Sequence, residues 1–298
     1  MNNSLPYVLL TAARNEASHL RRLLISVTSQ TVKPIRWVII SDASSDGTDE
    51  LVSEFSSQYS WIELIRMSEA TPRDFRAKAL CIKQGFQSVA ELEFDVIGNL
   101  DADVSFATDY FEFLIGKFAA SPNLGVAGTS YLEGAFCSTR SRFADLTHVP
   151  GQCQLFRRRC FESIGAYLPV KEGGIDTIAV TMAKVGGWHT RTFVEKSFLH
   201  HRRMGTWAGN SLRTAFRAGE RDCLLGNHLL WQTARSFLMA TQKPFLLGAV
   251  LNWLGYTLCA MRLRKKNMPA KGVELRQREQ LQRLAVICRY LLRKKLFY

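Results

Sequence analysis

Residues 94–103 read FDVIGNLDAD, an apolar run that ends in two aspartates, Asp101 and Asp103. Shorter runs that also read as strands occupy residues 7–11 (YVLLT), 37–40 (WVII) and 61–65 (WIELI). Segments with apolar residues at helical spacing alternate with these runs, so four β-α units in a row are predicted. Such a series predicts an α/β fold with a mostly parallel central sheet flanked by helices. Ligands bind beyond the carboxyl ends of the strands in such sheets, and both aspartates fall there.

The helices of this region are expected over residues 15–29, from Thr48 onward and over 75–89. Further along, the pattern predicts a loop running into a short helix over 151–164, a helix over 175–185, a strand over 188–194 and helical structure over 208–242. The regular alternation of strand and helix is therefore expected to end near the middle of the chain.

The composition describes a globular chain with its positive charge gathered at one end. The 298 residues are 47% apolar and 22% charged, enough for one large domain with an appendage or for two domains. The net charge is +13, but residues 243–298 hold 13 Lys and Arg against 2 Glu, and the rest nets only +2. Because the basicity is local, no nucleic-acid partner is expected. Seven Cys without a CxxC pair favour a reducing compartment, and no signal peptide is evident.

Asp101 and Asp103 have the chemistry of a divalent-cation site. Two carboxylates two residues apart can hold a cation together with a diphosphate, and oxygen ligands suit Mg²⁺ or Mn²⁺. The cation would offset the charge of a diphosphate leaving group. A solvated turn or a helix N-cap also explains such a pair, because DxD alone is a common sequence. The position after an apolar strand favours the cation site.

Further polar residues lie at the same predicted edge. Asp42 ends the second strand and can bind a base or a ribose hydroxyl, or cap the next helix. Arg14 and Glu16 lie where the first strand enters its helix, and Glu16 either caps that helix or faces a nucleotide. Lys78, in the third helical segment, is either a surface lysine or a phosphate contact.

The order of these motifs resembles a known family. The stretches are VLLTAARNE (8–16), VIISDASSDGT (38–48), FRAKAL (75–80), VIGNLDADV (96–104), GQCQLFRRRCFESIGAY (151–167) and GGIDTIAVTMAKVGGW (173–188). In combination, over about residues 5–205, they resemble the inverting GT-A glycosyltransferases of family 2. The resemblance implies a GT-A catalytic domain over residues 1–207, followed by a helical C-terminal region over 208–298. It also implies a nucleotide-diphosphate sugar donor and Mg²⁺ or Mn²⁺ as cofactor.

The resemblance also implies roles for individual residues. Asp42 matches the family's nucleoside-binding aspartate, and Asp101 and Asp103 match its DxD, with Asp103 the usual metal ligand. Asp176 in GGID matches the general base, although Ile175 replaces the acid that commonly precedes it. The other reading of Asp176 is a helix N-cap, which is compatible with catalysis.

The remaining candidates are assigned with the same resemblance. The donor-binding candidates are Ala12, Arg14, Glu16, Asp42, Lys78 and Asp101. Gly151, Arg157 and Arg158 resemble the Gly and Arg-Arg stretch near the acceptor and donor phosphates. A late histidine completes the metal site in many GT-A enzymes, and either His200 or His201 is placed to do so here. The sequence does not choose between them.

The C-terminal region suits a membrane surface. Residues 245–261 (FLLGAVLNWLGYTLCAM) are apolar apart from one Asn and lie between Lys243 and a basic cluster. Residues 277–296 predict a basic amphipathic helix whose apolar face includes Leu291 and Leu292. Both features favour an anionic membrane surface, with a core helix and a solvated tail as the alternative. We expect a cytoplasmic protein that is peripheral or monotopic on the inner face of the plasma membrane.

A non-processive, inverting glycosyltransferase is therefore expected, since the QxxRW motif of the processive synthases is absent. It would move one sugar, UDP-linked by preference, to a lipid-linked or saccharide acceptor in exopolysaccharide or cell-envelope glycan synthesis. Two other classes remain open. A sugar nucleotidyltransferase would want a glycine-rich phosphate loop, but residues 11–16 contain no glycine. A non-enzymatic basic protein that binds membranes or nucleic acid would explain only the C-terminal region.

Overall fold

The computed structural model describes residues 5–68, 71–72, 74–140, 144–202, 211–240 and 246–295. Contacts divide the chain into two units. The first unit comprises residues 1–171 and 175–203, and the second comprises residues 172–174 and 204–298. The boundary expected at 207/208 lies among residues 203–210, outside the described part of the chain.

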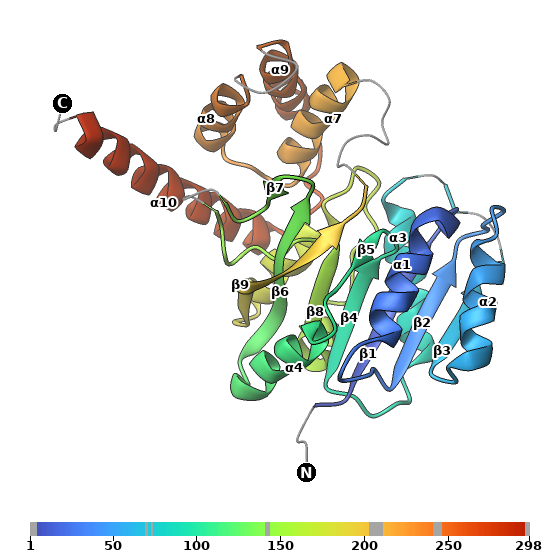
Figure 1. Cartoon of the computed structure of the whole chain (residues 1–298). Coiled ribbons are helices and arrows are strands. Elements are labelled where there is room, and N and C mark those ends of the chain that lie inside the picture. The colour runs from blue at the N-terminus through green and yellow to red at the C-terminus, as the bar shows by residue number, and fades with distance from the viewer. Residues whose placement is uncertain are drawn as a thin grey trace. The chain divides into compact units, whose positions relative to one another are not determined.

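One sheet organises the first unit (Figure 1). Its parallel half has the order β3-β2-β1-β4 and consists of β1 (Tyr7–Ala13), β2 (Arg36–Ser41), β3 (Ile62–Arg66) and β4 (Val96–Asp101). These are the four strands that the apolar runs predict. In β1, β2 and β4 the side chains are buried along nearly the whole strand, because helices cover both faces.

The other half of the sheet is mixed. It consists of β5 (Val104–Ser105), β6 (Leu124–Glu133), β7 (Phe136–Cys137), β8 (Cys153–Arg157) and β9 (His189–His200). Strand β8 is antiparallel to β4 and to β6, whereas β9 runs parallel to β6 and antiparallel to β5. The predicted α/β class with a mostly parallel central sheet is confirmed.

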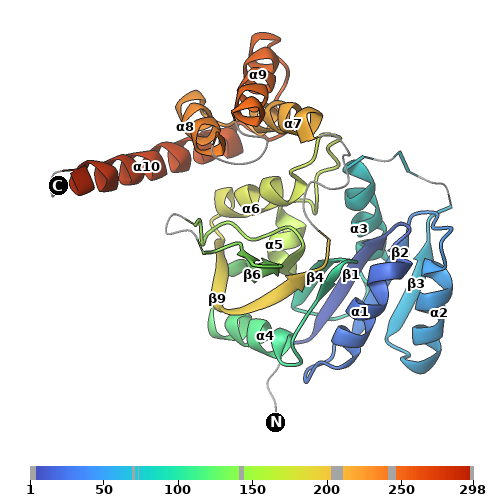
Figure 2. The same ribbon diagram turned by 45° about the horizontal axis from the view of Figure 1, so that its top comes forward.

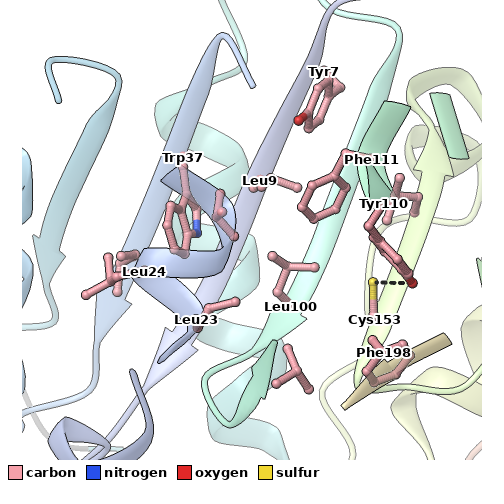
Figure 3. Close-up of a cluster of buried hydrophobic side chains, with 14 of the residues drawn as sticks. Tyr7, Leu9, Leu23, Leu24, Trp37, Leu100, Tyr110, Phe111, Cys153 and Phe198 are labelled. Carbon is pink, nitrogen blue, oxygen red and sulfur yellow. Dashed lines mark hydrogen bonds between the residues drawn. The ribbon is translucent and has the colours of Figure 1, made fainter. Parts of the chain in front are cut away.

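Helices cover the two faces of the sheet in two sets (Figure 2). One face carries α1 (Ala17–Thr28), α2 (Thr48–Gln58) and α4 (Tyr110–Ala120), and the other carries α3 (Arg76–Ser88), α5 (Arg158–Ser163) and α6 (Ile175–Val185). Strand β1 supplies both cores because its side chains alternate: Leu9 packs in one cluster and Leu10 in the other. In the first cluster, Trp37 and Leu23 lie near Leu9 (Figure 3).

The prediction of a loop over the first part of residues 151–164 is wrong. That stretch forms β8, with four buried residues, before α5 begins. Strand β8 pairs with β4 and β6, and both are distant from it in the sequence. The local periodicity of residues 151–164 therefore gives little indication of this pairing. The strand expected over 188–194 is also longer and continues to His200 along β6. Both differences arise from long-range pairing.

The second unit contains α7 (Ser211–Leu224), α8 (Leu229–Met239), α9 (Leu247–Met261) and α10 (Ala270–Lys295). Two helices therefore occupy the region expected to be helical over 208–242. Phe245, Leu296 and the side chains of Leu291 and Leu292 lie outside the described part of the chain. Among the described residues, none of the helices combines the length and the apolarity that crossing a bilayer requires.

Helices α7 and α9 approach each other at two glycines. A Cβ on Gly219 would lie 1.9 Å from the carbonyl oxygen of Asn252, and one on Gly255 would lie 2.1 Å from that of Phe216. The obstructing atoms belong to the backbone, so a larger side chain would force the two helices apart.

Gly255→Ala is therefore expected to destabilise the second unit by about 3 kcal/mol, at the upper end of typical overpacking costs. Urea unfolding followed by circular dichroism measures the change. The matched control is Gly116→Ala in α4, where an added Cβ meets nothing within 4 Å and better helix propensity should add up to about 1 kcal/mol. Equal stability of the two variants would contradict the close crossing.

Candidate active site

The site begins where three neighbouring strands of the sheet end. In the register of the sheet Ala12 lies opposite Asp101, and Ala13 lies opposite Ser41, the residue before Asp42. Strand β1 has β2 on one side and β4 on the other, so the strand order reverses at this point. Open α/β sheets bind ligands at such a reversal. The predicted residues Ala12, Arg14, Asp42 and Asp101 thus share one edge of the sheet.

Lys78 is a residue of this site. From the first turn of α3 its ammonium group forms an ion pair with Asp101 and donates a hydrogen bond to the carbonyl oxygen of Gly151 (3.1 Å). Burial alone would lower the pKa of Lys78, but Asp101 and the neighbouring carboxylates raise it overall. Burial also raises the pKa of Asp101, against the effect of Lys78. The ion pair with Asp101 argues against a solvated surface lysine, and the contact of Lys78 with a phosphate stays a prediction.

Asp176 lies beside this pair. It belongs to the first turn of α6, and a Cβ built on Gly151 would lie 2.8 Å from its carboxylate oxygen Oδ2. The amide of Asp101 donates to the carbonyl oxygen of Gln152 (2.9 Å), which fixes the chain next to Gly151 against β4. A continuous series of contacts therefore links Asp101, Lys78, Gly151 and Asp176, residues that come from separate parts of the sequence.

Asp103 is held by a histidine and an arginine. Its carboxylate lies 3.5 Å from Nε2 of His200 and 3.5 Å from Nε of Arg202. The other ring nitrogen of His200, Nδ1, lies 3.2 Å from Oε2 of Glu133. Burial alone would raise the pKa of Asp103, but His200 and Arg202 lower it overall. Burial alone would lower the pKa of His200, and Asp103 and Glu133 raise it overall.

The two candidate histidines have different surroundings. His200 points at the carboxylate of Asp103, whereas Nε2 of His201 lies 2.8 Å from the hydroxyl of Ser105. The backbone amide of His201 donates to the carbonyl oxygen of Asp103 (2.9 Å). His201 follows the last residue of β9, and its ring contacts Ser105, whereas the ring of His200 lies between Asp103 and Glu133.

Asp101 and Asp103, with the neighbouring His200, form an acidic cluster that has suitable donors for a hard divalent cation. The carboxylates of Asp101 and Asp103 and the imidazole of His200 are oxygen and nitrogen ligands of the kind Mn²⁺ accepts, and the carboxylates also suit Mg²⁺. Asp101 is paired with Lys78, and Asp103 with His200 and Arg202. As they stand, the described residues include no group of three or more His, Cys, Asp or Glu that could hold a metal ion.

Asp42 is buried and binds the chain just before α3. Its carboxylate accepts hydrogen bonds from the amide (2.9 Å) and hydroxyl (2.7 Å) of Thr71 and from Arg14 (3.0 Å). Arg14 also donates to the carbonyl oxygen of Thr71 (2.6 Å). Asp42 thus anchors residue 71 at the edge of the sheet, and Arg14 is its ion-pair partner.

Glu16 does not cap its helix through its side chain. It occupies the N-cap position of α1 without a side-chain capping bond, and its carboxylate forms an ion pair with Arg202. Burial raises the pKa of Glu16. Arg202 therefore bridges Glu16 and Asp103, and of the two readings of Glu16 the one that faces the site fits this geometry.

Arg157 and Arg158 are not part of the site, and the expectation that they lie near the phosphates is wrong. Strand β8 runs antiparallel to β4, so Arg157 pairs with Val96 at the far end of β4 from Asp101. The guanidinium of Arg157 donates to carbonyl oxygens at and beyond the end of α4, the nearest that of Phe118 (2.8 Å). The guanidinium of Arg158 donates to the carbonyl oxygens of Ala90 and Leu92.

Comparison with known proteins places the chain in a family. The family model described as glycosyl transferase family 2 matches residues 9–165, more than half of the chain. Comparison with curated proteins finds no match.

Solved structures show the same fold. A mannosyltransferase from Pyrobaculum calidifontis, in complex with GDP-Man and Mn²⁺, is 18% identical with a TM-score of 0.58, over 88% of this chain and 75% of that chain. Residues 1–349 of S. aureus TarS, in complex with UDP-GlcNAc, are 10% identical with a TM-score of 0.57, over 87% and 73%. GalNAc-T7 with UDP, GalNAc and Mn²⁺ is 14% identical with a TM-score of 0.58, over 90% and 56%.

The motif order, the sheet with its acidic edge and the shared fold agree with the family match. The chain belongs to glycosyl transferase family 2 and is a GT-A glycosyltransferase.

Proposed function

We propose that this enzyme moves one sugar from a nucleoside-diphosphate donor, UDP-linked by preference, to a hydroxyl group of a lipid-linked or saccharide acceptor, with inversion. The observation that carries the proposal is the series of contacts from Asp101 through Lys78 and Gly151 to Asp176. It brings a candidate cation site and a candidate base to one edge of the sheet. The similar structures hold UDP-linked and GDP-linked donors, so the nucleotide itself has to be tested.

Each acidic residue has a distinct role in this proposal. Asp101, Asp103 and His200 would hold Mn²⁺ or Mg²⁺, which would neutralise charge on the diphosphate of the donor. Lys78 and Arg202 supply further positive charge beside those carboxylates. Asp176 accepts the proton of the acceptor hydroxyl as that oxygen attacks the anomeric carbon, whose bond to the diphosphate breaks and releases the nucleoside diphosphate. Asp42 and Arg14 bind the nucleoside, directly or through the chain at Thr71 that they anchor.

The second unit would bring the enzyme to its acceptor. Residues 204–298 contain 17 Lys and Arg against 4 Asp and Glu, whereas residues 1–203 contain 22 of each. The whole net charge therefore belongs to the part of the chain that the second unit comprises, which suits an anionic membrane surface. A peripheral or monotopic position on the inner face of the plasma membrane, and a role in exopolysaccharide or envelope glycan synthesis, belong to the proposal.

A thermal-shift panel of nucleotide sugars tests the proposal. Ligands that bind the folded state raise the unfolding midpoint, so one sugar nucleotide is expected to do so with Mn²⁺ present and much less with EDTA. Free sugars without the nucleotide serve as the control. A panel in which no nucleotide sugar shifts the midpoint would contradict the proposal.

Glu133→Gln is expected to weaken Mn²⁺ binding by about 10–100-fold, the usual effect of removing a carboxylate that orients a metal-bound histidine. The reason is that Glu133 holds Nδ1 of His200 and leaves Nε2 directed at Asp103. Isothermal titration with Mn²⁺ alone measures the change. The control is His201→Ala, which removes the neighbouring ring without touching that contact. Equal Mn²⁺ affinities in the two variants would remove His200 from the cation site.

A further inference from the structure

Helix α9 is apolar on all sides but is buried on only one. The buried residues are Gly248, Ala249, Asn252, Gly255, Tyr256 and Cys259. The exposed apolar residues are Leu247, Val250, Trp253, Leu254, Leu258 and Met261. The first set has the spacing of a single helical face and packs on α7, and the second set lies on the remaining surface. A contiguous apolar surface of this kind on a folded unit marks a binding face.

A leucine with unusual backbone geometry stands at each end of α9. Leu246 has φ of 50° and Leu263 has φ of 48°, a region that costs a branched side chain free energy. Neither side chain packs in a core, since Leu246 is 69% exposed and Leu263 is 90% exposed. Both leucines are therefore exposed apolar side chains at positions whose backbone conformation glycine adopts at lower cost.

Helix α8 extends the apolar face. The indole nitrogen of Trp253 donates to the hydroxyl of Thr233 on α8 (3.4 Å), which places that side of α8 next to the exposed face of α9. Leu230 and Phe237 lie three and four residues from Thr233, on the same side of α8, and both are exposed. The apolar face thus covers two adjacent helices.

Positive charge borders this face, and negative charge is absent from it. Arg262, Arg264, Lys265 and Lys271 follow α9 and are exposed, and residues 246–273 contain no Asp or Glu. Of these residues, Arg264 forms an ion pair with Glu172 at 3.0 Å. A second copy of the chain would bring a second cluster of like charge to the same place, whereas an anionic bilayer offers apolar acyl chains beneath negative headgroups.

We propose that the exposed face of α8 and α9, within residues 229–238 and 246–263, docks on an anionic phospholipid bilayer and lies in the headgroup region without crossing it. Leu246 and Leu263 enter the acyl layer at the two ends of α9, and the basic residues that follow α9 pair with lipid phosphates. The inference deepens the membrane association proposed above and rests on it, but it does not depend on the transfer reaction.

Vesicle co-sedimentation of the full-length protein tests this proposal. The protein should bind vesicles that contain phosphatidylglycerol and remain in solution with vesicles of phosphatidylcholine alone. Val250→Ser with Leu254→Ser should weaken binding about tenfold, because both side chains would leave the acyl layer. Arg262→Gln with Lys265→Gln should weaken it about fivefold per residue.

Matched variants control for lost apolar area and lost charge. Ile25→Ser with Val194→Ser removes two exposed apolar side chains from the first unit, and Lys83→Gln with Arg159→Gln removes two exposed charges there. Both pairs should bind vesicles like the unaltered protein. Absence of binding by the unaltered protein, or equal loss in the control pairs, overturns the proposal. The proposal is also overturned if light scattering shows that the unaltered protein is a dimer and the α9 variants are monomers. In that case a second copy of the chain covers this face.

The thermal-shift panel of nucleotide sugars tests the transfer reaction independently of vesicle binding. A protein that binds its donor but not vesicles contradicts only the docking face. A protein that binds vesicles but no nucleotide sugar contradicts only the proposed reaction.

Discussion

Asp176→Asn is expected to lower turnover by about 10³-fold, in the range typical for removing a general base, while UDP binding stays within about threefold. Asparagine has nearly the same shape and fits against Gly151 as aspartate does, but it does not accept a proton from the acceptor hydroxyl. Turnover is followed as release of nucleoside diphosphate from the donor that the thermal-shift panel selects. UDP affinity is measured separately by titration calorimetry.

The control for Asp176 is Asp95→Asn. Asp95 is exposed and precedes β4, at the opposite end of that strand from Asp101, so its replacement should leave turnover unchanged. Unchanged turnover in Asp176→Asn would remove the assignment of the base. Loss of turnover together with loss of UDP binding would instead assign Asp176 to donor binding.

Asp103→Asn is expected to abolish the part of donor binding that requires Mn²⁺. Removing a residue that only orients a metal ligand already weakens metal binding by about 10–100-fold. Removing the proposed ligand itself should therefore weaken it by more than about 100-fold. The fold should survive, because asparagine has nearly the shape of aspartate and still presents an oxygen to His200 and Arg202. Calorimetry with UDP, with and without Mn²⁺, measures the effect, and circular dichroism confirms the fold.

Asp109→Asn is the matched control for Asp103. Asp109 is also an acid held by a cation, Lys196, but it lies at the start of α4. Donor binding that depends on Mn²⁺ to the same degree in Asp103→Asn and in the unaltered protein would contradict the cation site.

The sequence predicts the parallel half of the fold well for a physical reason. Strands β1, β2 and β4 are buried on both faces, so each appears as an uninterrupted apolar run that ends at a polar residue. The carboxyl ends of these strands meet at one edge, and this places Asp42 and Asp101 near Ala12 and Arg14 without knowledge of any other contact.

The errors and omissions come from pairings between distant residues. Arg157 ends β8 and Arg158 begins α5. No local sequence pattern indicates that β8 is antiparallel to β4, and this direction takes both arginines to the far end of the sheet. The sequence does not indicate Glu133 because it meets His200 only where β6 and β9 pair, and the two residues are 67 positions apart. A polar residue that ends an otherwise buried strand, as Glu133 does, is the signal that was available.

The most direct test of the account is the effect of UDP on Mn²⁺ affinity. If Asp101, Asp103 and His200 hold a cation that also binds the donor diphosphate, saturating UDP should tighten Mn²⁺ binding by about tenfold or more, and Mn²⁺ should tighten UDP binding by the same factor. Titration calorimetry measures both arms. Equal Mn²⁺ affinity with and without UDP would contradict the central claim that these residues gather around one cation and one diphosphate.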